Sequence, residues 1–362
     1  MLNLLAACIA VQTSTLDPTP LPPETDTGGT KIDTGGSTTP TPPSTVSGCA
    51  AVTGTRAVWL IDRADPTKVV KPVQPPVSTE VTWEISGPDA LGRLYLLDQS
   101  KGEGFRIHRS DDGGCTWQLT GSAPSGLLGH MYTGPTSSRL YVRYDYDLYV
   151  SEDGGVSFTQ VSTTAPRAPM RVIGGSPDHL WASVDQTVWS SADGGVTWTA
   201  QLALEVDGVG FDWSDPPRLA AGGAAIQVWE DPAWSTVLDL PDERGWPVWE
   251  PGGGMWVLVR NSHGLPEHSV RSADGAAPFV ATGWSPAYDE QIRHLVPDDG
   301  ALATGGILYD GAVWGGSYVS VRTADGALVR HDAEAFEDVI GLSFTDTAVV
   351  AALRVPGTEQ PD

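Results

Sequence analysis

The eight-residue segment SDDGGCTW, which begins at Ser110, recurs as SEDGGVSF at Ser151 and as SADGGVTW at Ser191. The three copies start 41 and 40 residues apart, and a degenerate copy, SADGAAPF, starts 81 residues later at Ser272. Short alternating apolar and polar stretches lie between the copies, four of them in the unit that contains Ser191. A period near 40 residues made of several short strands is typical of the blades of a β-propeller.

The repeated segment, called the box below, is predicted to be the turn between the third and fourth strands of each blade. Its Asp can accept hydrogen bonds from backbone N–H groups that follow it, its glycines adopt positive φ, and its closing aromatic packs between blades. The 81 residues between Ser191 and Ser272 correspond to two repeats, and the copy expected between them lies near WEDPAWST at residues 229–236. The structural box residues are Ser110, Asp112, Gly113, Gly114, Trp117, Ser151, Asp153, Gly154, Gly155, Phe158, Ser191, Asp193, Gly194, Gly195, Trp198, Ser272, Asp274 and Gly275.

Composition favours an all-β domain. The 362 residues include 42 Gly, 29 Pro and 14 Trp, and no long stretch places apolar residues every three or four positions. The formal net charge is −24 and no Lys/Arg cluster interrupts it, which argues against nucleic acid as a partner. We interpret the acidic surface as one that keeps the protein soluble.

The pattern S-x-D-G-G-x-[TS]-[WF] resembles the Asp-box, or BNR repeat, of sialidases, sortilin-type receptors, some glucan hydrolases and photosystem assembly factors. The resemblance covers roughly residues 50–355 and implies a propeller domain over residues 49–356 with a disordered tail at 357–362. We expect seven four-stranded blades, with six or eight as alternatives because the unit after residue 285 is long. The family contains enzymes as well as binding proteins, so the repeat by itself assigns no activity.

Both ends of the propeller domain are predicted to complete one blade. The segment VIGLSFTDTAVVAALRV near the C-terminus supplies two strands. The segment RAVWLIDRADPTKVVKPV supplies a third strand, a decayed box at residues 62–68 and a fourth strand. A shared blade removes the open sheet edges that would otherwise favour aggregation.

The first residues, MLNLLAAC, resemble the lipobox of bacterial lipoproteins, which implies a signal over residues 1–8 and lipidation of Cys8. The apolar run is short and no basic residue precedes it, so either the true start lies upstream or the match is accidental. Residues 9–48 are rich in Thr, Pro, Gly and Ser, and we expect a disordered tether there. Together they predict an exported lipoprotein of the outer membrane or cell surface, otherwise a secreted or periplasmic protein, attached to membrane through its lipid alone.

The three cysteines agree with export. If Cys8 carries lipid, Cys49 and Cys115 remain as a pair for oxidation, and a bridge would fasten the start of the domain to a box. Two separate thiols are the alternative.

A sialidase-like glycoside hydrolase is one alternative function. The resemblance to sialidases implies three arginines, a Tyr nucleophile and an acidic proton donor. Arg106 in FRIH falls on a third strand rather than an inner one. Arg171 and Arg293 start inner strands, from which their side chains could line the channel, with Tyr288, Asp289 and Glu290 nearby. No acid and nucleophile pair stands out, so we predict no catalytic residues.

No metal or cofactor is expected, because the seven histidines are scattered and the boxes lack the ligand series of a calcium loop. We expect a monomeric binding or scaffolding propeller for a protein or carbohydrate ligand, with an assembly factor for a membrane complex as another alternative. In the resembling family the ligand face lies opposite the boxes, which points to loops between second and third strands and between blades. The candidates there are Tyr144, Tyr146, Arg244, Trp246, His263, Tyr288 and Arg293.

Overall fold

The computed structural model describes Cys49 and most of residues 58–354, all within the unit formed by residues 40–362. The gaps in this range are 71–81, 101–103, 123–128, 135–136, 145–146, 163–171, 177, 185–186, 204–207, 213–217, 231–232, 262–264, 288–289, 311–312 and 334–337. The predicted signal, tether and tail therefore lie outside the described residues, as do Cys8, Arg171 and three ligand-face candidates, Tyr146, His263 and Tyr288.

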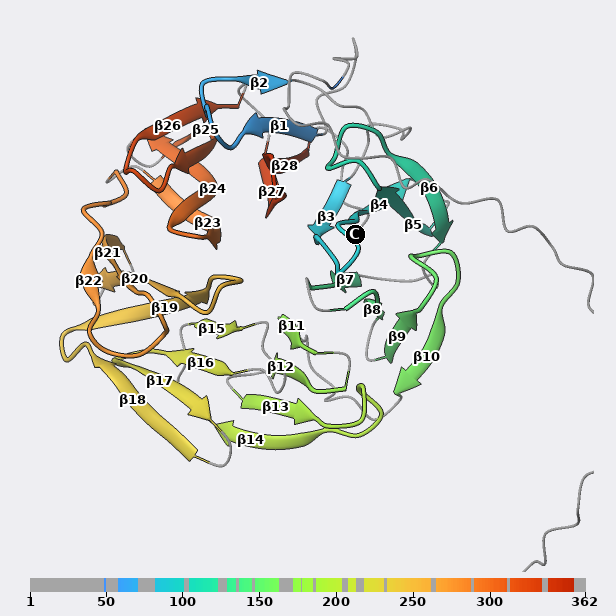
Figure 1. Cartoon of the computed structure of the whole chain (residues 1–362), viewed down its shortest axis with the longest axis horizontal. Coiled ribbons are helices and arrows are strands. Elements are labelled where there is room, and N and C mark those ends of the chain that lie inside the picture. Colours follow the sequence, from blue (N-terminus) through green and yellow to red (C-terminus); the bar gives the residue numbers. More distant parts are fainter. Residues whose placement is uncertain are drawn as a thin grey trace, which may run out of the picture. The chain divides into compact units, whose positions relative to one another are not determined.

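Seven four-stranded antiparallel sheets surround a central axis, which confirms the predicted seven-bladed propeller (Figure 1). From the innermost strand outward, blade 1 consists of β27 (Asp338–Phe344), β28 (Ala348–Arg354), β1 (Val58–Asp62) and β2 (Val69–Val70), and blade 2 of β3 (Thr82–Ser86), β4 (Leu94–Ser100), β5 (Gly104–Ser110) and β6 (Gln118–Ser122). In the same order, blade 3 consists of β7 (Gly129–Tyr132), β8 (Leu140–Tyr144), β9 (Asp147–Ser151) and β10 (Thr159–Ser162), blade 4 of β11 (Val172–Gly175), β12 (Leu180–Val184), β13 (Thr187–Ser191) and β14 (Thr199–Ala203), and blade 5 of β15 (Gly208–Phe211), β16 (Leu219–Gly222), β17 (Ala225–Glu230) and β18 (Ala233–Asp239). Blade 6 consists of β19 (Glu243–Trp249), β20 (Met255–Asn261), β21 (Pro266–Ser272) and β22 (Val280–Ala281), and blade 7 of β23 (Glu290–Asp298), β24 (Ala301–Asp310), β25 (Val313–Arg322) and β26 (Leu328–Asp332). No helix occurs in the part of the chain that is described, so none there could span a membrane.

Blade 1 closes the ring as the sequence predicts. The N-terminal strand β1 pairs with the C-terminal strand β28 in an antiparallel register from Val58 opposite Ala352 to Asp62 opposite Ala348. The long unit after residue 285 is one blade, because β24 and β25 are ten-residue strands that extend blade 7 without adding another.

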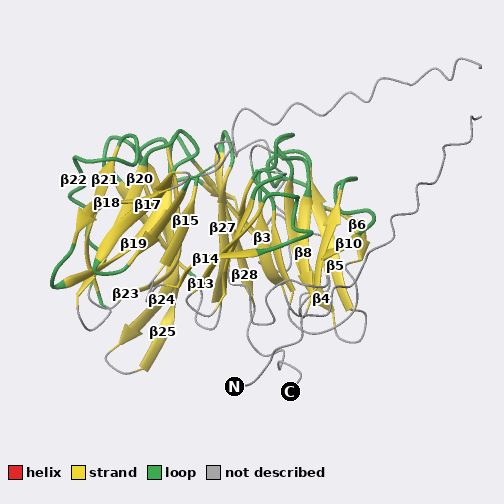
Figure 2. Cartoon of the chain, turned by 90° about the horizontal axis from the view of Figure 1, so that it is seen from below, coloured by secondary structure: helices red, strands yellow, loops and turns green. Residues whose placement is uncertain are grey.

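The turns that follow first strands and third strands lie at one end of the propeller, which we call the box face. Figure 2 shows the described loops gathered mainly at this end. The other joints lie at the second end, called the opposite face. The box at Ser110 joins β5 to β6, the third and fourth strands of blade 2, as predicted.

The core lies between neighbouring blades. Trp117, which closes the first box, is buried in a cluster with Leu60 and Val350 of blade 1 and Leu94 and Leu96 of its own blade. The second box glycine lies so near blade 1 that a Cβ on Gly114 would be 2.9 Å from Leu60 Cδ2. The box aromatic therefore wedges between blades, as the sequence indicates.

The box turns have the predicted hydrogen bonds. In the copy at Ser191, the Asp193 carboxylate accepts the Thr197 backbone N–H at 2.9 Å and the Thr197 hydroxyl at 2.6 Å. The Ser191 hydroxyl accepts the Gly195 N–H at 2.8 Å, and Gly194 and Gly195 have φ of 69° and 97°. The Ser191, Asp193 and Thr197 side chains are thus used to hold the turn.

These hydrogen bonds predict a pH dependence of stability. The Ser157 and Thr197 hydroxyls lower the pKa values of Asp153 and Asp193 to about 2, below their ordinary 3.8. The resulting stabilisation is complete above about pH 4 and is lost as the pH falls toward about 2. We expect the urea midpoint of a D153N/D193N variant to fall less than that of the parent over this range. Equal losses in the two proteins would contradict the prediction.

Cys49 and Cys115 form a disulfide, with their Cα atoms 5.2 Å apart. Both cysteines pack against the cluster that contains Leu60 of blade 1 and Trp117 of blade 2. The bridge therefore fastens the chain just before blade 1 to the box of blade 2. This confirms the predicted pairing over the alternative of two separate thiols.

Candidate functional site

A cavity of about 450 Å³ opens at the centre of the box face, where the innermost strands end. Each of the seven blades contributes to its lining, which consists of Gly87, Pro88, Tyr132, Gly174, Val209, Gly210, Phe211, Val248, Trp249, Pro251, Leu295, Val296, Pro297, Asp298, Phe344, Thr345 and Asp346. Most of these side chains are apolar. A mostly apolar hollow with a few polar groups is the usual form of a ligand site.

The innermost strands that form the cavity walls pack closely together. Gly174 of blade 4 lies against the ring of Phe211 in blade 5, where a Cβ on the glycine would be 2.6 Å from Phe211 Cδ2. The side chains of Phe211, Trp249 and Phe344 are largely buried, whereas Val209 and Val296 are half-buried and face the hollow. Each valine also packs against a core cluster, so a larger side chain there fills the hollow from a partly buried position.

Asp298 and Asp346 supply negative charge to the cavity wall. Burial raises the pKa of Asp298, although an ion pair with Arg63 at 2.5 Å favours its charged form. The Arg63 guanidinium also lies over the ring of Phe344, 5.5 Å from its centroid. The cavity therefore combines an apolar floor with one partly buried, arginine-paired carboxylate at its edge.

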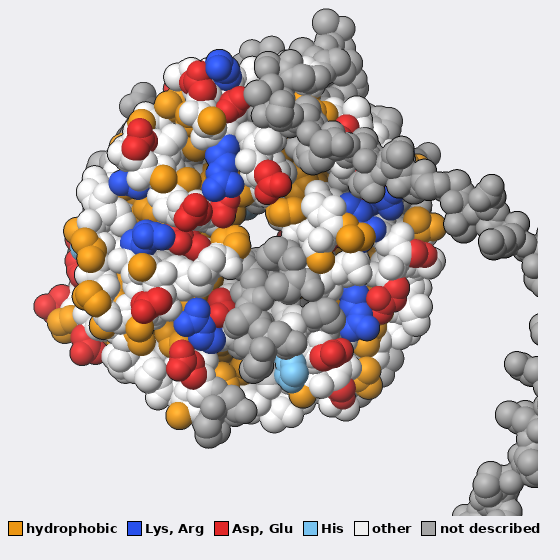
Figure 3. Space-filling model, viewed as in Figure 1, with side chains coloured by type: hydrophobic (Ala, Val, Ile, Leu, Met, Phe, Trp, Pro, Cys, Tyr) orange, Lys and Arg blue, Asp and Glu red, His pale blue; other side chains and the backbone are white. Residues whose placement is uncertain are grey.

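Basic and acidic side chains alternate around this opening, and hydrophobic side chains gather close to it (Figure 3). Three buried carboxylates on this face each form an ion pair of 2.6 Å with an arginine, namely Asp89 with Arg93, Asp212 with Arg218, and Glu250 with Arg271. Some of these groups also reach the next blade: Arg93 donates to Ser138 O at 3.1 Å, and Arg218 donates to Asp274 O at 3.0 Å. The arginines of the box face thus hold turns and blades together.

The sequence-predicted ligand residues that the structure describes lie outside this cavity. Arg244 is exposed and Trp246 is half-buried on β19, with the Arg260 guanidinium 4.9 Å from the centroid of the Trp246 ring. Arg293 is exposed at a bulge of β23, between Ile292 and His294. None of these three lines the central cavity. Tyr144 ends β8 at the opposite face, and its side chain is outside the described part.

Arg106 lies on β5, the third strand of blade 2, as the sequence predicts. It therefore does not occupy the inner-strand position that the resemblance to sialidases would require of a substrate arginine. Tyr288 and Asp289, which the hydrolase alternative would use, fall in a gap of the description.

Sequence reasoning missed the cavity residues because they belong to seven segments spread over the whole chain. Tyr132, Phe211, Trp249 and Phe344 each end or nearly end an innermost strand. They share one position in the 40-residue unit, the end of the first strand, and this shared position was the signal from which they could have been predicted. The family resemblance directed attention away from that end, because it places ligands opposite the boxes.

The chain matches no protein-family model, and no curated protein matches it in sequence. The chain resembles the solved structure of the β-propeller domain of the Trilobed protease from Pyrococcus furiosus, with a TM-score of 0.52 and 10% sequence identity over 77% of this chain and 93% of that one. It also resembles puromycin hydrolase, with a TM-score of 0.51 and 14% identity over 78% of this chain and 51% of that one. A third similar structure is YCF48 bound to D1 peptide, with a TM-score of 0.49 and 14% identity over 84% of this chain and 99% of that one. The first two of these likenesses, with TM-scores above 0.5, agree with the β-propeller fold. At such identities they assign no activity.

Proposed function

We propose that this chain is an exported, membrane-tethered propeller that binds a protein or glycan ligand rather than transforming one. The observation that carries the proposal is the central cavity of the box face, about 450 Å³ in volume and lined by every blade. A pocket with aromatic and aliphatic walls favours an apolar side chain or the apolar face of a sugar ring. The partly buried Asp298 at its edge, which is paired with Arg63, would orient a donor group of the ligand.

The repeated turns support membership of the Asp-box superfamily as part of this proposal. In the boxes at Ser110 and Ser151, the Ser hydroxyl donates to the Asp two residues on and accepts the N–H of the second Gly. This makes the boxes structural and leaves ligand recognition to other parts of the propeller.

The proposed surface location rests on Cys8 and on the composition of residues 9–48. A flexible tether of this length has an average end-to-end distance of about 35 Å, enough to hold a domain away from a membrane. Cys49, which follows the tether, is bonded to the box face through Cys115. Mass spectrometry of the mature N-terminus should find an acylated Cys8, whereas an intact Met1 would reject lipidation.

Filling the cavity should abolish ligand binding. Binders selected from a peptide library and from a glycan array on the parent protein should lose at least about tenfold in affinity for Val296→Trp, because the indole occupies the ligand's space. Val209→Trp fills the hollow from another blade and should have the same effect. Val280→Trp, at a position 63% exposed on the outer strand β22, is the matched control.

The thermal stability of each variant should be measured beside its binding, so that lost binding is separated from unfolding. Binders that retain full affinity for folded Val296→Trp and folded Val209→Trp would show that the cavity is not the site.

The same cavity favours glycoside hydrolysis as a second candidate function. Asp298 and Asp346 both line it, and burial raises the pKa of Asp298 against the opposing effect of its ion pair with Arg63, so Asp298 is the carboxyl to test as a general acid beside a second carboxylate. Turnover of fluorogenic sialosides or glucosides that disappears in Asp298→Asn would favour the hydrolase. Turnover that persists in Asp298→Asn would remove this assignment of roles.

A further inference from the structure

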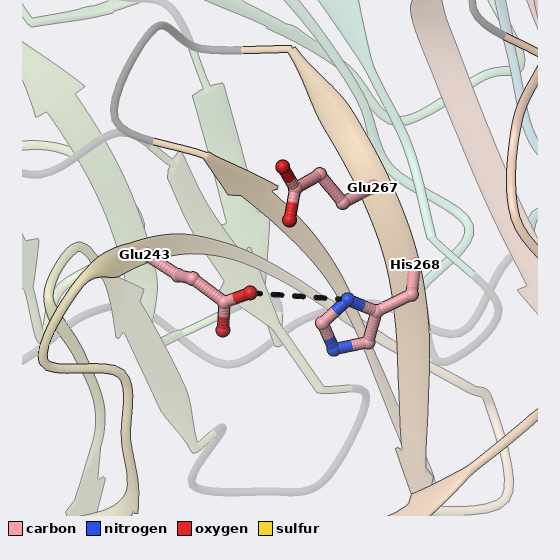
Figure 4. Close-up of side chains that lie close together, drawn as sticks. All are labelled: Glu243, Glu267 and His268. Atoms are coloured by element: carbon pink, nitrogen blue, oxygen red, sulfur yellow. Dashed lines mark ion pairs between the residues drawn. The ribbon is translucent and has the colours of Figure 1, made fainter.

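The opposite face carries a second group of side chains, on blade 6. Glu243 begins β19, and Glu267 and His268 lie at the start of β21, with β20 between the two strands. One ligand atom from each residue lies within 4.8 Å of the other two. The three side chains approach a common space from two strands (Figure 4).

A β-bulge explains how two consecutive residues contribute to one group. Val259 pairs with His268 and Arg260 pairs with Pro266, so Glu267 is an extra residue on β21 without a partner in the ladder. In a regular strand, Glu267 and His268 would point to opposite faces of the sheet. The bulge redirects the side chain and brings both residues near Glu243.

The distances leave room for an ion. His268 Nδ1 is 4.0 Å from Glu243 Oε1, too far for a direct hydrogen bond. Around a tetrahedral zinc with bonds of about 2.0 to 2.2 Å, neighbouring ligand atoms are about 3.4 Å apart. The His268 and Glu243 side chains are 43% and 32% exposed, so small rotations can close the difference.

Charge favours a divalent cation at this place. The group holds two carboxylates and one imidazole, and among the described residues the Glu267 carboxylate has no hydrogen bond or ion pair of its own. A bound cation would offset the repulsion between the carboxylates. One nitrogen and two oxygen ligands suit zinc better than calcium or magnesium, which prefer oxygen alone.

We propose that Glu243, Glu267 and His268 form a zinc site on the opposite face of the propeller. Three protein ligands leave a coordination position for water or for an oxygen of a partner molecule. The three ligands of the site come from the described strands β19 and β21, and the exposed Arg244 follows Glu243 on β19. The site does not depend on the ligand cavity, which lies at the other end of the propeller.

Zinc titration of the full chain tests the proposal. Every protein should carry Cys8→Ser, and the Cys49–Cys115 disulfide should be verified by thiol assay, so that no free thiolate competes for the metal. We expect one high-affinity zinc ion per chain by competition with a chromophoric chelator. Each of Glu243→Gln, Glu267→Gln and His268→Gln should weaken this binding by at least about tenfold.

His130→Gln is the matched control. His130 Nδ1 lies 3.9 Å from Glu84 Oε2, almost the same distance as in the proposed site, but no third ligand joins this pair among the described residues. This variant should bind zinc like the parent. Zinc should also raise the melting temperature of the parent and of His130→Gln, and not that of His268→Gln.

Two outcomes would overturn the zinc site. One is the absence of stoichiometric binding by the folded parent at zinc concentrations of about 100 μM, above the range expected for a functional three-ligand site. The other is unchanged affinity in folded Glu267→Gln and folded His268→Gln, which would place any bound zinc elsewhere on the chain.

Discussion

Replacing Glu250 by Ala should lower the free energy of unfolding by about 2 to 4 kcal/mol, because it leaves the buried Trp256 indole and the partly exposed Arg271 guanidinium without their acceptor. The Glu250 side chain is 3% exposed. Its carboxylate accepts two hydrogen bonds from the Arg271 guanidinium, at 2.7 and 2.6 Å, and one from the Trp256 indole at 2.6 Å. It also accepts the Gly300 N–H of blade 7 at 3.1 Å, so the change weakens the junction between two blades.

Urea unfolding monitored by tryptophan fluorescence measures this loss. The matched control is Glu152→Ala, which removes a 2.8 Å ion pair with Arg139 on the same face, from a carboxylate that is 61% exposed. Exposed pairs contribute little, so the control should lose no more than about 1 kcal/mol. Equal losses in the two variants would mean that burial of the Glu250 network adds nothing to stability.

Removal of the disulfide should cost about 2 to 4 kcal/mol, chiefly because the unfolded chain regains the freedom of a 66-residue loop. The double variant Cys49→Ser/Cys115→Val is suited to this test, because the sister boxes carry Val156 and Val196 at the position of Cys115. Valine therefore fits the turn itself. The loss should appear as a lower urea midpoint than that of the oxidised parent.

The reduced parent controls for the substitutions. It should unfold at the same urea concentration as the double variant, because both lack the bridge and keep the same box turn. A double variant as stable as the oxidised parent would show that closure of blade 1 by β1 and β28 suffices without the bridge.

The fold could be predicted because the propeller repeats a local signal. Each box marks one turn between third and fourth strands, and the spacing of Ser110, Ser151 and Ser191 counts blades directly. Even the shared blade could be predicted, since the two ends of the domain have complementary numbers of strands. The pairing of Cys49 with Cys115 followed from the small number of candidates.

The candidate sites could not be predicted in the same way, because they depend on contacts between distant segments. The cavity brings together residues as far apart in the sequence as Pro88 and Phe344, at the ends of innermost strands that pack around the axis of the propeller. The proposed zinc group depends on a bulge at Glu267, and no feature of the spacing from Glu243 to His268 predicts that bulge.

Hydrogen exchange with and without a selected ligand, in zinc-free buffer, tests most directly whether the box-face cavity is the binding site. We expect slower exchange at the ends of the innermost strands that line the cavity, around Gly87, Val296 and Phe344. Protection confined to the opposite face, around Arg244 and residues 265–268, with no change at the cavity, would contradict this expectation.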